Sequence, residues 1–263
     1  DRSPSRGLGD VYKRQFLWGT SFIAGKIAYN MFDPSLVVAL RYIFASIILS
    51  PVTISFIRQE KETINKKDFF MLILLGILTY PFTSMLQFIG LSFTSASSAT
   101  TIIGIEPIII TMIGFIFFKE KTSSIVFFLG IIAFLGVALT VGVSALENIS
   151  FFGCFLVFLS TIVVSFWVQL SKKVLTKINS NYYTALTIQL GTIFALPIML
   201  FLVKNWEIYY SLKGIIALLY LIVGCSIGAG WFWNKGLERS EASKSGIFLA
   251  LEPVFGILFA VLI

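Results

Sequence analysis

Long apolar runs alternate with short polar segments along the chain from Phe16 onward. Each run has about the 20 residues that an α-helix needs to cross the hydrocarbon core of a bilayer. The runs are continuously apolar rather than alternating, which favours membrane helices over the strands of a barrel. The pattern predicts nine spans, at 16–32, 35–57, 69–91, 96–118, 124–143, 151–170, 181–203, 214–234 and 242–263.

Composition agrees with this pattern. Hydrophobic residues make up 57% of the 263 residues and charged residues only 13%, whereas a soluble domain usually carries about 25% charged residues. A water-soluble globule and a disordered chain are therefore both excluded. We expect an all-α integral membrane protein whose partner is the lipid bilayer.

The net charge of +7 does not indicate nucleic-acid binding, because the basic residues lie in short loops between apolar runs. With a cytoplasmic N-terminus, eleven basic residues fall in cytoplasmic loops and two in outer loops, a strong positive-inside bias. We expect a multi-pass protein of the cell (inner) membrane with this orientation. The eleven are Arg58, Lys61, Lys66, Lys67, Lys119, Lys121, Lys172, Lys173, Lys177, Lys235 and Arg239; the two are Lys204 and Lys213.

Both ends of the chain depart from the pattern. Residues 1–15 (DRSPSRGLGDVYKRQ) are polar, lack the apolar region of a signal peptide, and closely resemble a translated adaptor sequence. We expect this segment to be an adaptor artefact that packs against nothing. The chain stops at Ile263 within an apolar run, so we expect a fragment of a longer protein.

An internal repeat emerges when the chain is compared with itself at an offset of 146 residues. Gly90-Leu91 then matches Gly236-Leu237, and Glu106-Pro107 matches Glu252-Pro253. We predict a first five-helix repeat at 16–143 and a second at 150–263, truncated after its fourth helix. Because five is odd, the second copy is inverted, which predicts a ten-helix fold with nine helices present and a substrate site at the repeat interface.

Several short motifs, in order at this spacing, resemble the EamA-type transporters of the drug/metabolite transporter superfamily. The resemblance implies ten helices, a central cavity, and export or exchange of small metabolites. It also implies a modest structural importance for Glu120. The chain departs from the family where an acid, Glu106, precedes the mid-helix proline. The motifs are Trp18-Gly19 with Phe22 and Lys26, Leu40-Arg41-Tyr42, Ser95-Ala96-Ser97 with Pro107 and Lys119-Glu120-Lys121, Ser240-Glu241-Ala242-Ser243, and Leu251-Glu252-Pro253.

Glu106 and Glu252 are the first candidates for chemistry, because each is an acid near the middle of a predicted span. A charge there costs about 2.5–3.5 kcal/mol or more on insertion. Each acid precedes a proline, Pro107 or Pro253, that frees a helix carbonyl. Two interpretations stay open: each glutamate satisfies a local kink, or the pair binds a proton or the substrate.

Other polar and aromatic residues also have two interpretations. In the third span, Tyr80, Thr83, Ser84 and Gln87 form a stripe that either joins helices or lines a wet cavity. Trp18 and Trp233 either pack in the core and at the membrane interface or line a substrate cavity. Lys26 and Arg41, near the outer ends of their spans, either reach the lipid headgroups or attract an anion.

The chain contains no His and only two separated Cys, and it has no phosphate-binding loop and no G-x-S-x-G motif. We therefore expect no enzyme, no metal and no cofactor. The function predicted is a secondary transporter of small organic metabolites that works by alternating access, with proton coupling as an option. A channel or a structural membrane protein is the alternative, and a membrane-embedded enzyme is less favoured. A monomer and a homodimer both remain open.

Overall fold

The structure is a computed structural model that describes residues 4–59, 64–120, 150–239 and 248–262, with the single residues 125, 128, 131, 132, 135 and 245. Within these residues all regular structure is helical, and six helices are long and apolar enough to cross a membrane. Most of the predicted span 124–143, Lys121 and the motif 240–243 lie outside the described residues. The six are Pro34–Gln59, Lys66–Ser92, Ser98–Phe118, Phe151–Leu175, Ser180–Phe201 and Leu212–Arg239.

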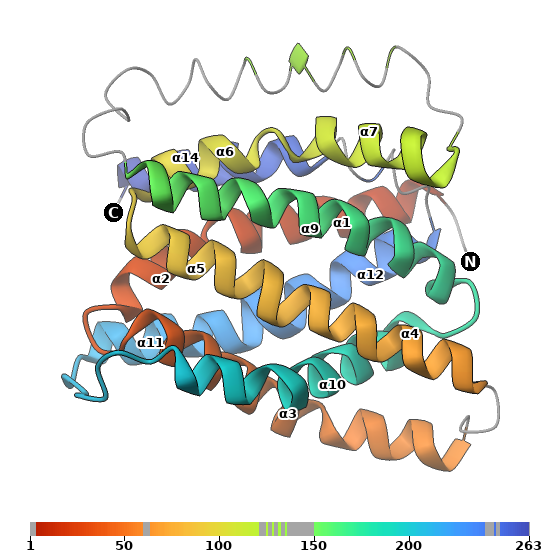
Figure 1. The fold of residues 1–263 in the computed structure, drawn as a ribbon, viewed down its shortest axis with the longest axis horizontal. Coiled ribbons are helices and arrows are strands. Elements are labelled where there is room, and N and C mark those ends of the chain that lie inside the picture. The colour runs from red at the N-terminus through yellow and green to blue at the C-terminus, as the bar shows by residue number, and fades with distance from the viewer. Residues whose placement is uncertain are drawn as a thin grey trace.

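The described helices lie side by side along one axis, so their connections gather at two ends of the molecule (Figure 1). Two of the long rods contain a π-helical segment, labelled η2 and η4. The elements are α1 Pro4–Gly19, α2 Ser21–Ala28, α3 Pro34–Gln59, α4 Lys66–Ile77, η2 Leu78–Ser84, α5 Met85–Ser92, α6 Ala96–Ile103, α7 Glu106–Phe118, α9 Phe151–Leu175, α10 Ser180–Phe201, α11 Leu212–Tyr220, η4 Leu221–Gly228, α12 Ala229–Arg239, η5 Phe248–Ala250 and α14 Leu251–Leu262.

Short polar side chains set the starts of several helices. The side chain of the residue just before each helix accepts a hydrogen bond from a backbone N–H of the first turn, which no helical carbonyl can satisfy. These caps explain why the observed starts agree with the polar boundaries of the apolar runs. The capping residues are Asn65 for α4, Ser95 for α6, Ser150 for α9, Asn179 for α10 and Ser211 for α11.

Each π-helical segment contains the same kind of hydrogen bond, from a side-chain hydroxyl to the carbonyl five residues earlier. In η2 the Thr83 hydroxyl donates to the Leu78 carbonyl over 3.1 Å, and in η4 the Ser226 hydroxyl donates to the Leu221 carbonyl over 2.9 Å. Hydroxyl groups of this kind satisfy carbonyls that a distorted membrane helix leaves free. The two distortions thus bring polar side chains to the middle of otherwise apolar rods.

The sequence predicts one continuous helix over 96–118, but the structure contains two helices there. Helix α6 ends at Ile103, the chain turns at Gly104 and Ile105, and α7 begins at Glu106. Pro107 lies in the first turn of α7, where its missing N–H costs no helical hydrogen bond. The proline therefore starts a new helix instead of kinking an existing one.

The expectation that residues 1–15 pack against nothing is also wrong. Helix α1 runs from Pro4 to Gly19 and packs against α12 and α14. Val11 is fully buried, and the rings of Tyr12 and Phe16 meet the ring of Phe255 edge to face. An apolar stripe on an otherwise polar helix is sufficient to produce this packing.

Two helix crossings depend on glycine. A Cβ atom on Gly76 of α4 would lie 2.7 Å from the backbone nitrogen of Gly191 in α10. A Cβ atom on Gly90 of α5 would lie 2.8 Å from the carbonyl oxygen of Gly153 in α9. Small residues allow membrane helices to approach this closely.

Buried apolar side chains form two main clusters. One contains Tyr42, Tyr80 and Phe88 and lies mainly between α3, α5, α10 and η4; the other contains Trp167 and Trp233 and lies mainly between α4, α9, α10 and α12. Many large apolar side chains are exposed on the outer helix faces, as expected of a surface that meets lipid. Tyr80 and Phe88 of the first cluster and Trp167 of the second line one cavity, which is described below.

Candidate functional site

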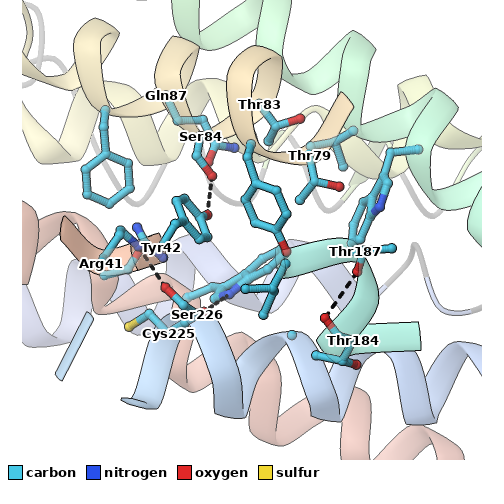
Figure 2. A pocket seen from close by; sticks show the side chains of 18 of the residues that line it. Arg41, Tyr42, Thr79, Thr83, Ser84, Gln87, Thr184, Thr187, Cys225 and Ser226 are labelled. Carbon is cyan, nitrogen blue, oxygen red and sulfur yellow. Dashed lines mark hydrogen bonds between the residues drawn. The ribbon is translucent and has the colours of Figure 1, made fainter. Parts of the chain in front are cut away.

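A largely enclosed cavity of about 60 Å³ lies in the middle of the helix assembly, a volume that can hold a few water molecules. Segments distant in the sequence meet there, because its walls come from α1, α2, α3, η2, α5, α9, α10, η4, α12 and α14. Polar side chains converge on it from several sides (Figure 2). The cavity is the strongest candidate for a small-molecule site among the described residues.

Tyr80, Ser84 and Gln87, predicted from the stripe in the third span, all line the cavity. The hydroxyl groups of Ser84 and Tyr42 are hydrogen-bonded to each other, as Figure 2 shows. The rings of Tyr42 and Tyr80 meet edge to face with centroids 4.2 Å apart. The stripe therefore joins helices and lines the cavity at the same time, so the two interpretations are not exclusive.

The two predicted tryptophans have different positions. Trp18 lines the cavity, and its indole nitrogen donates to the carbonyl oxygen of Cys225 over 2.8 Å. Trp233 is fully buried and stacks on Trp167, with ring centroids 6.3 Å apart. Trp167 itself lines the cavity, so Trp233 supports the wall from behind.

Both predicted glutamates are buried at the starts of helices. Glu106 begins α7 after the turn at 104–105, and Glu252 lies in the first turn of α14 after η5. The positive end of a helix dipole stabilises a carboxylate at such a position. Glu252 also lines the cavity.

Arg14 lies beside Glu252. Its Nη1 atom is 3.0 Å from the Glu252 Oε2 atom, and both side chains are buried. The guanidinium group also stacks over the ring of Trp18, 3.3 Å from its centroid. This ion pair joins α1 to α14.

Pro253 and Glu120, predicted as structural residues together with Pro107, also have defined places. Pro253 is buried in the first turn of α14. The Glu120 carboxylate accepts a hydrogen bond from the Gln169 side chain over 3.1 Å, and its backbone N–H donates to the carbonyl of Gly114. Glu120 thereby joins the end of α7 to α9.

Arg41 contradicts the interpretation in which its side chain reaches the lipid headgroups. The side chain is buried and lines the cavity, and its Nε atom donates to the Ser226 hydroxyl over 2.9 Å (Figure 2). Arg41 is seven positions after the start of α3 at Pro34, a rise of about 10 Å along the helix. That depth is enough to place it inside the protein.

Comparison with known proteins identifies the family. Residues 15–142 and 151–263 match the EamA-like transporter family, and together they cover most of the chain. The chain belongs to the EamA-like transporter family. An uncharacterized transporter of Haemophilus influenzae is 45% identical over 133 residues, which are 49% of this chain and 78% of that protein. An uncharacterized transporter of Archaeoglobus fulgidus is 25% identical over 248 residues, 93% of this chain and 84% of that protein.

A solved structure supports the fold of this EamA-like transporter. One crystal structure superposes with a TM-score of 0.79 and covers 99% of this chain and 88% of its own, at 15% sequence identity. At that identity the likeness concerns the fold alone. Among the described residues, no group of three or more His, Cys, Asp or Glu side chains could hold a metal ion.

The cavity of this EamA-like transporter also contains polar residues that the sequence analysis missed. Thr184, Thr187 and Asn234 line it, and the Asn234 side chain donates to the Thr184 hydroxyl over 2.9 Å. Ser180, Thr184 and Thr187 recur at helical spacing along one face of α10. That spacing within an apolar run is the signal that could have found this wall.

Proposed function

We propose that the chain is a secondary transporter that carries small organic metabolites by alternating access. The observation that carries this proposal is the polar cavity enclosed between helices from both halves of the chain. Membrane transporters of this kind bind their substrate near the bilayer midplane, between two repeats. The same cavity favours transport over catalysis: most of its polar lining is hydroxyl and amide groups, and its one thiol, Cys225, donates to the Leu17 carbonyl rather than to a base.

We also propose that the two halves are inverted repeats. Helices at the repeat spacing run in opposite directions: α3 runs from left to right in Figure 1, and α10 runs from right to left. The same reversal relates α1 to α9 and α6–α7 to α14. The match of the family to two stretches, 15–142 and 151–263, supports the same division.

The contacts between helices support this proposed symmetry. Helix α1 packs against α12 and α14, and the equivalent helix α9 packs against α5 and α7. Residues 146 positions apart meet where a two-fold axis would pass: the Ser46 hydroxyl donates to the Thr192 hydroxyl over 3.0 Å. Helix α14 also packs against α6, which lies in the equivalent stretch of the first half. In a symmetric pair, residues on the axis contact their own equivalents.

We propose that the protein lies in the inner membrane with its N-terminus in the cytoplasm. The basic loops lie at one end of the assembly, on the right in Figure 1, where α3, α7, α9 and α12 end. The opposite end carries the loop at 202–211 with Lys204. This asymmetry supports the positive-inside arrangement.

In the proposed mechanism, Glu106 and Glu252 bind and release the proton that drives transport. Both are buried, both start a helix after a break, and Glu252 faces the cavity. A buried carboxyl group that meets the substrate cavity in one state and water in another can exchange a proton in each cycle.

Counterflow tests the proposed function. The complete natural gene is expressed, and the protein is reconstituted into liposomes filled with a small-molecule extract of bacterial cells. We expect saturable exchange of one or a few compounds across the membrane. A channel would instead pass compounds without saturation or exchange, and a structural protein would pass none, so either result would reject the transporter.

A further inference from the structure

The guanidinium group of Arg41 is a buried positive charge with an unused hydrogen-bonding atom. The residue is 4% exposed, and among the described residues the Nη1 atom has no hydrogen-bond partner. The Nε atom is held by Ser226, which fixes the orientation of the planar group. Figure 2 shows Arg41 and Ser226 facing each other at one end of the cavity.

The environment of Arg41 attracts an anion without supplying one. No Asp or Glu in the described part of the chain forms a salt bridge with it. Its guanidinium lies over the rings of Tyr42 and Phe88, with centroids 5.0 and 4.8 Å away. Aromatic faces stabilise a cation only partly, and a buried charge that lacks a counter-ion is strongly unfavourable. A site of this kind gains most from a ligand that brings the missing negative charge.

The cavity walls limit the charge of such a ligand. Arg41 and Glu252 are the charged residues among the described residues that line it. A phosphate group carries nearly two negative charges at neutral pH and would need further donors, whereas a carboxylate carries one. Arginine matches a carboxylate through parallel N–H groups in one plane. The unused Nη1 atom and its neighbour Nη2 form the outer end of the planar group, where two parallel N–H groups can donate to the two oxygens of one carboxylate.

We propose that Arg41 binds the carboxylate of the transported metabolite, so that the substrate is an organic acid carrying one carboxylate at this end of the cavity. This inference rests on the proposed transport function and names its substrate class. Ser226, Tyr42 and Phe88 act as positioning residues, because they hold the guanidinium in place.

The experiment compares what the natural protein and its Arg41 variants move out of liposomes. Proteoliposomes are loaded with the soluble small-molecule extract of bacterial cells, and mass spectrometry follows each compound. We expect carboxylates to dominate the compounds that the natural protein moves. Arg41→Gln should slow their export about tenfold or more, as expected from losing a hydrogen bond to a charged group. Arg41→Lys keeps the charge without the planar fork and should give an intermediate rate.

Two controls separate binding from folding. Lys213→Gln removes an exposed positive charge near the same end of the assembly and should leave export unchanged. Thermal unfolding of ligand-free Arg41→Gln, followed by tryptophan fluorescence, should occur at or above the natural midpoint, because an uncompensated buried charge has been removed. A residue with only a structural role would instead lower that midpoint and slow every compound alike.

The remaining outcomes each reject either the role of Arg41 or the transport function. Movement of uncharged or cationic compounds alone would overturn the role of Arg41 and leave the transporter standing. Movement of nothing beyond empty liposomes would reject the proposed function itself. Unchanged carboxylate export by Arg41→Gln would overturn the inference. If Arg41→Gln fails to fold, the Arg41→Lys variant decides. A folded Arg41→Lys protein that exports carboxylates as well as the natural protein does would overturn the inference.

Discussion

Glu106 and Glu252 occupy equivalent positions on their helices, 146 residues apart. Each follows a break in its helix, each precedes a proline, and each is at most 3% exposed. The positive end of a helix dipole and the following proline explain how a carboxyl group is tolerated at these positions.

Replacing these acids with glutamine should separate proton coupling from exchange. Glu106→Gln and Glu252→Gln keep the shape and hydrogen-bonding ability but cannot titrate. We expect both variants to insert and to exchange substrate, yet to lose accumulation driven by a pH gradient in proteoliposomes. Alanine at either position should lower stability by about 1–3 kcal/mol, because buried partners are left unsatisfied.

The matched control for this prediction is Glu207→Gln, which alters an exposed acid in the loop at 202–211 and should keep pH-driven accumulation. Full pH-coupled uptake by the Glu106→Gln, Glu252→Gln double variant would reject the proton-carrying role and leave the two acids with a structural one.

At the residue scale, the sequence predicted which acids and hydroxyl groups lie inside the protein better than it predicted the position of the Arg41 side chain. An acid inside an apolar run has no route to water, so Glu106 and Glu252 stand out at once. An arginine near a helix end has two destinations, because its long side chain can reach the headgroups or turn inward. Only the packing of α3 against η4 selects between them, and that packing is not encoded in any one span.

At the scale of the helices, close crossings make particular glycines sensitive. Gly76→Ala would force a Cβ atom against the backbone of α10, and overpacking of this kind costs about 1–3 kcal/mol. We expect a lower thermal midpoint in detergent, measured by tryptophan fluorescence.

Gly230 provides the comparison for Gly76. A Cβ atom there would meet only the Thr184 methyl carbon, at an ordinary 3.8 Å, and alanine gains about 1 kcal/mol of helix propensity over glycine. Gly230→Ala should therefore leave the midpoint unchanged or raise it. A Gly76→Ala protein as stable as Gly230→Ala would show that the α4–α10 crossing can move apart without cost.

Helix α1 combines a packed position with an unusual sequence. It carries Asp10 and Arg14 into buried positions, where charges are rare in membrane helices. We predict that the codons before Phe16 in the natural gene differ from those that encode residues 1–15. Sequencing the gene from genomic DNA checks this, and finding all fifteen codons unchanged would establish Arg14 as the natural partner of Glu252.

Element boundaries were predictable where a physical rule acts locally. Apolar length predicted the six spans, and in the structure Asn65 and Ser95, at the polar ends of two apolar runs, cap the starts of α4 and α6. The turn at Gly104 and Ile105 was not predictable in the same way, because a proline at 107 fits both a kink and a new first turn. The π-helical segments were missed because their hydrogen bonds, from Thr83 and Ser226, become visible only in three dimensions.

At the scale of the whole molecule, the proposed inverted repeat gives the cavity two chemically different ends from one helix plan. Arg41 and Ser226 face each other at one end, and Thr184 and Thr187 lie at the other (Figure 2). Because the equivalent helices α3 and α10 supply opposite ends, the proposal expects the polar residues that differ between the halves to determine what is bound. A movement that exchanges the shapes of the halves would open one end and close the other.

Cysteine labelling tests both the inversion and the orientation with two pairs of exposed residues 146 positions apart. Asn30 and Thr176 form one pair, and Arg58 and Lys204 form the other. In the complete protein, with Cys154 and Cys225 changed to alanine, each of the four is replaced singly by cysteine. Inverted repeats put the two members of a pair on opposite faces of the membrane, and the positive-inside rule puts Arg58 in the cytoplasm. A membrane-impermeant maleimide added to intact cells should therefore label Asn30→Cys and Lys204→Cys, and should reach Thr176→Cys and Arg58→Cys only after the cells are opened. Labelling of both members of a pair from the same side would mean parallel repeats, and the reverse pattern would mean inverted repeats in the opposite orientation.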